Sequence, residues 1–212
     1  MNNNSQQNSF GIDFSAVPTI PEDPVQLIKF YTDFKSLLAQ EREKIKQFHR
    51  SGAGGREVVQ AHTSLVDSIL HHLIKSLASR GKYPPEILFE EFSLIAVGGY
   101  GRGELNPCSD IDLLFLTPKK IRRATDLLIQ DFIPTFWDLG WEMGSSCRTL
   151  KECLLQAEKD ITIKTSMIET RFMVGNQAKY QKFFQSIGKN ALRKNIKGFL
   201  DAKTKEKSLR YE

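Results

Sequence analysis

The chain of 212 residues is 40% hydrophobic and 26% charged, a composition typical of globular proteins that can bury a sizeable core. No apolar run approaches the roughly 20 residues that cross a bilayer, which excludes a membrane-spanning protein. The formal net charge of +5 suits an anionic ligand, but it does not distinguish a nucleotide from nucleic acid or an acidic protein.

The amino-terminal segment, residues 1–23, is rich in Asn, Gln and Ser and contains no Lys or Arg. This composition predicts a flexible leader, because it offers too little apolar surface to offset the entropy lost on ordering. The segment also lacks the basic and apolar parts of a secretory signal, so we expect a cytoplasmic protein. Three cysteines without a C-x-x-C pair fit reduced thiols better than a disulfide framework or a zinc site.

Two long helices are predicted in the next segment, residues 24–90. The first spans residues 24–50, because Pro24 suits the first helical position and Asp23 can cap it. A glycine-rich break follows, and apolar residues then recur at helical spacing over residues 56–79. We expect these two helices to be packing elements.

The central segment, residues 91–150, changes to short buried strands and forms the predicted core of the fold. A glycine-rich turn ends the first strand, and a helix over residues 117–139 joins the second strand to the third. The predicted strands cover residues 92–97, 111–116 and 141–147.

The carboxy-terminal segment, residues 151–212, is predicted to be helical. The helices cover residues 150–157, 160–174, 177–187 and 189–211, and Thr149 with Glu152 matches a capping box. The fold class is therefore α+β, a small mixed sheet flanked by amino- and carboxy-terminal helices. The last helices are rich in Lys and Arg, which fits a solvated face or an anionic partner, while the lack of interleaved aromatic residues argues against nucleic acid.

Two carboxylates lie at the start of the second predicted strand, in Asp110-Ile111-Asp112. Alternate side chains of a strand share a face, so the two carboxylates should project together while Ile111 turns into the core. The two carboxylates repel each other unless a hard cation binds between them, and Mg²⁺ is the cation that best fits such a site. Two such ions can activate a hydroxyl and stabilise a leaving pyrophosphate. A plain polar turn is the alternative.

The glycine-rich turn before these carboxylates supplies a second part of the predicted site. Gly98 and Gly99 allow close approach of the backbone, whose N–H groups can hold phosphate oxygens, and Arg102 adds a cationic fork. The turn is neither a Walker A loop nor a dinucleotide fingerprint, because the required Lys and last Gly are missing. Arg102 could instead lie on the surface or pair with Glu104.

A third carboxylate is expected from the neighbouring strand, and Glu142 is the best candidate. It lies between two large apolar residues in Trp141-Glu142-Met143, a position where a charged side chain is unusual unless it has a functional role. The alternative is a glutamate of an edge strand that faces solvent.

These residues resemble the nucleotidyltransferase superfamily that includes DNA polymerase beta. A longer run closely resembles the amino-terminal domain of bacterial protein-PII uridylyltransferases, namely Gly98-Gly99-Tyr100-Gly101-Arg102-Gly103-Glu104-Leu105 followed by Pro107 and Ser109-Asp110-Ile111-Asp112. The resemblance implies transfer of UMP from UTP to a tyrosine hydroxyl of a PII-type protein. It implies that Gly98, Gly99, Arg102 and Ser109 bind the nucleotide, and that Asp110, Asp112 and Glu142 hold two Mg²⁺ ions.

The chain departs from that family in two ways. Ser145 stands where the family usually carries a histidine, which bears on substrate positioning but leaves the metal ligands intact. The family also continues into a phosphohydrolase domain with a His-Asp doublet and into glutamine-sensing domains. None of the four histidines here precedes an Asp, so we expect no uridylyl-removing activity.

Two other functions remain open at this stage. The chain could be a free-standing nucleotidyltransferase with another nucleotide or acceptor, because nothing in the glycine turn reads the base. It could also be a truncated remnant that binds a nucleotide or a partner without turnover.

Overall fold

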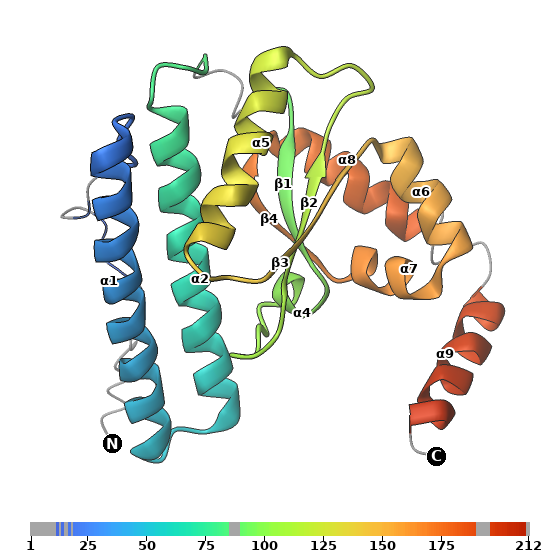
Figure 1. Ribbon diagram of the computed structural model, residues 1–212. Coiled ribbons are helices and arrows are strands. Elements are labelled where there is room, and N and C mark those ends of the chain that lie inside the picture. The colour runs from blue at the N-terminus through green and yellow to red at the C-terminus, as the bar shows by residue number, and fades with distance from the viewer. Residues whose placement is uncertain are drawn as a thin grey trace, which may run out of the picture.

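A computed structural model describes residues 12, 14, 17, 19–84, 90–189 and 196–210. It confirms the α+β class, with a four-stranded sheet between two groups of helices (Figure 1). Helices α1 and α2 lie to the left of the sheet, α6, α7 and α9 lie to its right, and α8 passes behind the strands. None of the described helices is long and apolar enough to span a membrane.

Helices α1 (Pro24–Arg50) and α2 (Gly55–Ala78) form a hairpin, close to the predicted bounds. The Asp23 side chain caps α1 by accepting a hydrogen bond from the Gln26 N–H at 2.9 Å, as its residue type predicts. Most of the predicted leader lies outside the described residues, but Ile20 is buried and its N–H donates to Ser76 Oγ.

The sheet has the strand order β3-β2-β1-β4. Strand β1 is antiparallel to both β2 and β4, whereas β2 and β3 are parallel and joined through α5 (Arg123–Asp138). The strands are β1 Ser93–Val97, β2 Ile111–Leu116, β3 Met143–Arg148 and β4 Thr170–Gly175. The mixed pairing agrees with the predicted mixed sheet.

Strand β4 corrects the helix predicted over residues 160–174. The chain instead forms α7 (Ile161–Ile168) and then turns into β4, which pairs with the edge of β1 that β2 leaves open. Apolar spacing does not distinguish a short helix from a strand in such a run, and the deciding partner lies more than 70 residues away. The sheet therefore includes residues from the segment assigned to the carboxy-terminal helices.

Helix α5 also begins later than the predicted residue 117. The Thr117 N–H donates to the Arg148 carbonyl at 2.9 Å, which extends the β2–β3 ladder by one residue. The helix begins where the buried Glu91 accepts hydrogen bonds from the Arg122 N–H at 2.7 Å and from the Thr125 hydroxyl. This cap comes from a residue distant in sequence, so the local pattern does not reveal it.

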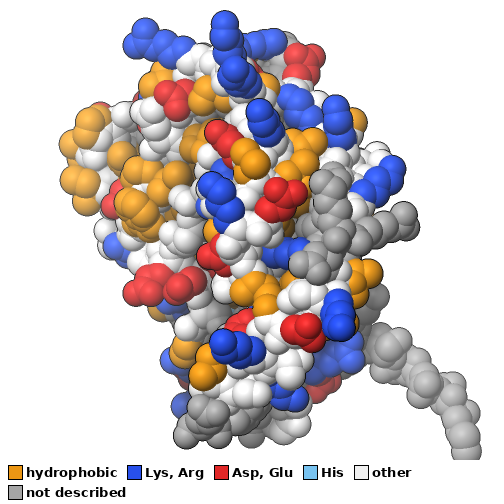
Figure 2. Space-filling view, turned by 90° about the vertical axis from the view of Figure 1, so that its right-hand side faces the viewer, with side chains coloured by type: hydrophobic (Ala, Val, Ile, Leu, Met, Phe, Trp, Pro, Cys, Tyr) orange, Lys and Arg blue, Asp and Glu red, His pale blue; other side chains and the backbone are white. Residues whose placement is uncertain are grey.

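The remaining helices are α6 (Leu150–Lys159), α8 (Gln177–Ile187) and α9 (Ile196–Arg210). The first two agree with the prediction, whereas residues 190–195 of the predicted last helix lie outside the described residues. Three lysines of α9, Lys197, Lys205 and Lys207, are exposed, which favours a solvated face. Figure 2 shows the face that carries these helices, with Lys and Arg interspersed among acidic and hydrophobic side chains.

Strands β1 and β2 are buried on both faces, so the sheet separates two hydrophobic clusters. Leu94 and Phe115 face the cluster shared with α1, α2 and α5, whereas Ile95 and Leu114 face the cluster shared with α6, α7 and α8. The alternation of a strand explains this division. Helices cover both faces of the sheet. A polar site can therefore form at the end of the sheet where β1 leads into α4 (Gly98–Gly101).

Candidate functional site

Asp110 and Asp112 flank the fully buried Ile111 at the start of β2, as the sequence predicts. Both residues are exposed by their overall accessibility. Within the described residues, neither carboxylate has a hydrogen-bond or ion-pair partner. The pair therefore carries two negative charges that the described part of the chain does not neutralise.

The pKa of Asp112 is raised, first because the surrounding protein partly excludes water from the carboxylate and second because of the charge on Asp110. The Cα of Asp112 pairs with that of Gly144 on the parallel strand β3. A Cβ at Gly144 would stand 2.5 Å from Asp112 Oδ1. The glycine therefore leaves the space that the Asp112 carboxylate occupies. The carboxylate oxygens of Asp110 and Asp112 are the kind of ligand that a divalent cation such as Mg²⁺ prefers.

The glycine-rich turn lies beside this carboxylate. Strand β1 leads directly into the short helix α4, where Gly98 has a φ of +62°, a conformation that favours glycine. A Cβ at Gly98 would be 3.8 Å from Asp112 Oδ2, in van der Waals contact. The antiparallel pairing of β1 with β2 brings the two motifs together, as expected for two parts of one site.

The Arg102 side chain is paired with two carboxylates. It donates to Glu104 Oε2 at 3.0 Å, which is the alternative raised by the sequence, and also to Glu169 at the end of α7. These contacts raise the pKa of the guanidinium, with the Glu104 hydrogen bond as the largest cause. Gly99 is next to it, since a Cβ there would be 3.7 Å from an Arg102 terminal nitrogen.

Ser109 and Glu142 lie at the same end of the sheet. Ser109 is exposed in the turn before β2, where its N–H donates to the Asn106 carbonyl at 3.0 Å. Glu142 is exposed immediately before β3 rather than inside it, so the predicted start of that strand is two residues early. Its carbonyl accepts a hydrogen bond from the Ile111 N–H at 3.1 Å, which places its backbone next to the start of β2.

The structure thus brings all the predicted residues to one end of the sheet but does not join them into one ligand cluster. No group of three or more His, Cys, Asp or Glu side chains in the described part of the chain could hold a metal ion as arranged. Asp112 is the carboxylate that lies beside the glycine turn, Asp110 lies two residues before it, and the backbone of Glu142 is hydrogen-bonded to Ile111 between them.

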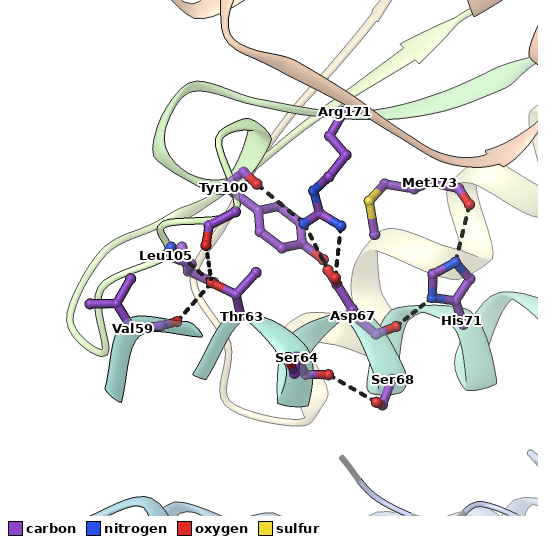
Figure 3. A network of polar contacts seen from close by, with 11 residues as sticks. Val59, Thr63, Ser64, Asp67, Ser68, His71, Tyr100, Leu105, Arg171 and Met173 are labelled. Atoms are coloured by element: carbon purple, nitrogen blue, oxygen red, sulfur yellow. Dashed lines mark hydrogen bonds and ion pairs between the residues drawn. The ribbon is translucent and has the colours of Figure 1, made fainter. Parts of the chain in front are cut away.

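A polar network that the sequence does not reveal supports the turn from behind (Figure 3). Tyr100 of α4 is buried, and its hydroxyl donates to Asp67 of α2 at 2.7 Å. Arg171 of β4 donates to both Asp67 oxygens, at 2.7 and 3.0 Å. Burial, followed by the Asp67 charge, raises the pKa of Tyr100 well above its usual value. The available signal is Asp67 itself, a charged residue within the mainly apolar run of residues 65–70, but its partner is 104 residues away.

Comparisons with known proteins agree with this geometry. The family model described as a nucleotidyltransferase domain matches residues 74–168, which include the glycine turn and both aspartates. The bifunctional uridylyltransferase/uridylyl-removing enzyme of Rhodospirillum rubrum is 30% identical over 196 residues, 91% of this chain and 21% of that protein. The protein of the same name from Burkholderia orbicola (strain AU 1054) is 43% identical over 124 residues, 58% of this chain and 14% of its own length.

A third relative, from Cereibacter sphaeroides, carries the same name and is 34% identical over 160 residues, 74% of this chain and 17% of that protein. The chain thus spans about a fifth of the length of these curated relatives or less. The matched residues run from the end of α2, through the glycine turn and the paired aspartates, to the end of α7. Residues 74–168 of the chain therefore match the nucleotidyltransferase domain family, and the chain is similar to part of the bifunctional uridylyltransferase/uridylyl-removing enzymes.

Proposed function

We propose that this chain transfers UMP from UTP to a tyrosine hydroxyl of a PII-type signalling protein. The observation that carries the transferase part is the position of the Gly98 turn beside Asp112, whose charge no described residue neutralises. The names of the relatives support the choice of a uridylyl group.

Asp110 and Asp112 would hold Mg²⁺, and Glu142 would complete the site after its side chain turns toward them. The metal supplies charge neutralisation for the triphosphate and a lower pKa for the attacking hydroxyl. Gly144 keeps the Asp112 carboxylate free to bind, because it places no side chain against Oδ1.

The backbone at Gly98 and Gly99 would approach the triphosphate closely, since neither residue has a side chain to block it. Ser109 would contact the nucleotide from the turn before β2. Arg102 would exchange part of its pairing with Glu104 and Glu169 for a phosphate oxygen. In the reaction the tyrosine oxygen forms a bond to the α-phosphorus while the bond to pyrophosphate breaks, and the hydroxyl proton leaves to solvent or a nearby base.

The proposal includes no uridylyl removal, because no histidine of the chain precedes an Asp. It also places the activity in a chain that covers only a fifth of the length of its relatives or less. The experiment must therefore test the chain by itself.

The test is to incubate the purified chain with Mg²⁺, labelled UTP and a PII protein, and to measure label on the PII protein. We expect transfer that needs Mg²⁺ and is lost in Asp110→Asn/Asp112→Asn. A folded chain that transfers nothing from UTP would contradict the proposal. Transfer from another triphosphate, or to another acceptor, would favour a free-standing transferase of different specificity.

Calorimetry separates a non-catalytic remnant from an inactive preparation. Binding of UTP with Mg²⁺ to the wild type, without transfer to any acceptor tested, would favour the remnant. Loss of that binding in Asp110→Asn/Asp112→Asn would still place the nucleotide at this site.

A further inference from the structure

The partly buried contacts of Asp67, Tyr100 and Arg171 join three elements that are distant in sequence. We infer that Asp67 and Arg171 are positioning residues that hold the turn in its nucleotide-binding shape and thereby set the affinity for the triphosphate. The inference rests on the proposed function, because it assumes that the nucleotide binds at Gly98 and Gly99.

The Arg171 side chain contacts the turn directly, and its backbone is paired with the strand that leads into the turn. One terminal nitrogen donates to Asp67 and also to the Tyr100 carbonyl at 3.3 Å, and the guanidinium lies 5.2 Å from the centre of the Tyr100 ring. Strand pairing fixes the origin of this side chain, because the Cα of Arg171 is the register partner of that of Ala96 in β1. Arg171 therefore links the turn to the sheet on which it begins.

Helix α2 holds the turn from the other side through residues spaced four apart. The Thr63 hydroxyl donates to the Gly103 carbonyl at 3.1 Å and accepts from the Leu105 N–H at 3.0 Å. Asp67 is one helical turn further along, and His71 one turn beyond that, where Nε2 lies 3.1 Å from the Met173 carbonyl of β4. A single stripe of α2 thus contacts the turn region and β4 (Figure 3).

The turn needs such support because it is rich in glycine. Glycine loses more conformational freedom on folding than any other residue, so a turn of this composition is not rigid by itself. The Gly101 backbone also packs closely on the start of β4, since a Cβ there would be 2.1 Å from the Glu169 carbonyl oxygen. A turn fixed before the nucleotide arrives loses less entropy on binding, which improves affinity.

Three variants test the inference. Arg171→Lys keeps the charge but loses the bidentate contact with Asp67. Asp67→Asn keeps the size of the side chain but loses its charge, and Tyr100→Phe removes only the hydrogen bond from the hydroxyl to Asp67. We expect the KM for UTP to rise about tenfold or more in the first two and less in Tyr100→Phe, with kcat within about threefold. A purely structural role would lower the melting temperature without this change in KM.

Asp131→Asn is the matched control. Asp131 also accepts hydrogen bonds from a tyrosine, Tyr83, and from a basic side chain, Lys82 at 2.7 Å, but it lies on α5 and contacts no residue of the turn. We expect Asp131→Asn to lower the melting temperature and leave the KM for UTP unchanged. Equal KM in all four variants and the wild type would overturn the inference.

Hydrogen exchange without nucleotide provides a second readout. We expect faster exchange of the amides of residues 98–105 in Arg171→Lys than in the wild type, and no change there in Asp131→Asn. Unchanged exchange in Arg171→Lys would overturn the inference. This measurement needs no UTP, so it tests whether Arg171 holds the turn even if the wild type transfers no UMP. Absence of transfer by the wild type would contradict the proposed function but not the role of Arg171.

Discussion

At the scale of single residues, the site depends on one missing side chain. Strand β3 runs parallel to β2, so the residue that faces Asp112 must leave room for its carboxylate, and Gly144 does so. The sequence predicts Asp110 and Asp112 from their spacing alone. It does not reveal the role of Gly144, because that role depends on the register between two strands.

Gly144→Ala tests this role. The added methyl would stand 2.5 Å from Asp112 Oδ1, so the carboxylate must move, and we expect the rate of nucleotidyl transfer to fall by about 10- to 100-fold. The control is Gly188→Ala at the end of α8, where an added Cβ meets no atom within 4 Å and should leave transfer unchanged. A Gly144→Ala protein with the wild-type rate would refute the argument.

The pKa of Asp112 leads to a prediction about stability. Its pKa is higher in the folded chain than the ordinary value of 3.8, chiefly through burial and then through Asp110, so ionisation of Asp112 opposes folding. This cost is fully present at neutral pH and disappears as the pH falls through the folded pKa toward 3.8. We therefore expect Asp112→Asn to raise the melting temperature at pH 7 while it lowers transfer at least about a hundredfold.

Melting curves at pH 7 and near pH 4 measure this effect. The difference between Asp112→Asn and the wild type should shrink at the lower pH. A variant that is less stable than the wild type at pH 7 would show that the carboxylate contributes favourable contacts instead.

At the scale of elements, the helix caps at Asp23 and Thr149 are local signals, and the sequence predicts both correctly. Thr149 begins α6 as predicted, because its hydroxyl accepts from the Glu152 N–H at 3.3 Å while the Glu152 carboxylate accepts from the Thr149 N–H at 2.7 Å. Strand β4 is missed, because the hydrogen bonds that define it are made to β1.

Thr149→Ala tests the cap. We expect a loss of about 1 kcal/mol in the free energy of unfolding, the usual cost of removing an N-cap side chain, or about 2–4 °C in melting temperature. Thr149→Ser keeps the acceptor and should lose much less. An equal loss in both variants would assign the effect to packing of the methyl group rather than to the cap.

At the scale of the whole molecule, the sheet divides the interior into two clusters that can be probed separately. The cluster under α6, α7 and α8 contains Cys153, which is fully buried, whereas Cys108 and Cys147 are exposed. Burial raises the pKa of the Cys153 thiol to about 12, so it is almost entirely protonated at neutral pH.

Alkylation with iodoacetamide at pH 8 tests this division. We expect Cys108 and Cys147 to react readily and Cys153 to react only when the helical layer over it opens. The rate at Cys153 should therefore rise steeply with urea, and mass spectrometry can follow the three sites separately. Reaction of Cys153 as fast as Cys147 in the absence of urea would show that this layer is not closed.

The sequence by itself determined the features that depend on neighbours along the chain. These are the α+β class, the long helices α1 and α2, the caps at Asp23 and Thr149, and the glycine turn with its paired aspartates, because periodicity, capping and strand alternation are local. Only the tertiary structure decided the features that depend on partners across the sheet. Strand β4, the clearance at Gly144, the pairing of Arg102 with Glu169 and the contacts of Asp67 with Arg171 all arise from strand register and packing, which join residues from 32 to more than 100 positions apart.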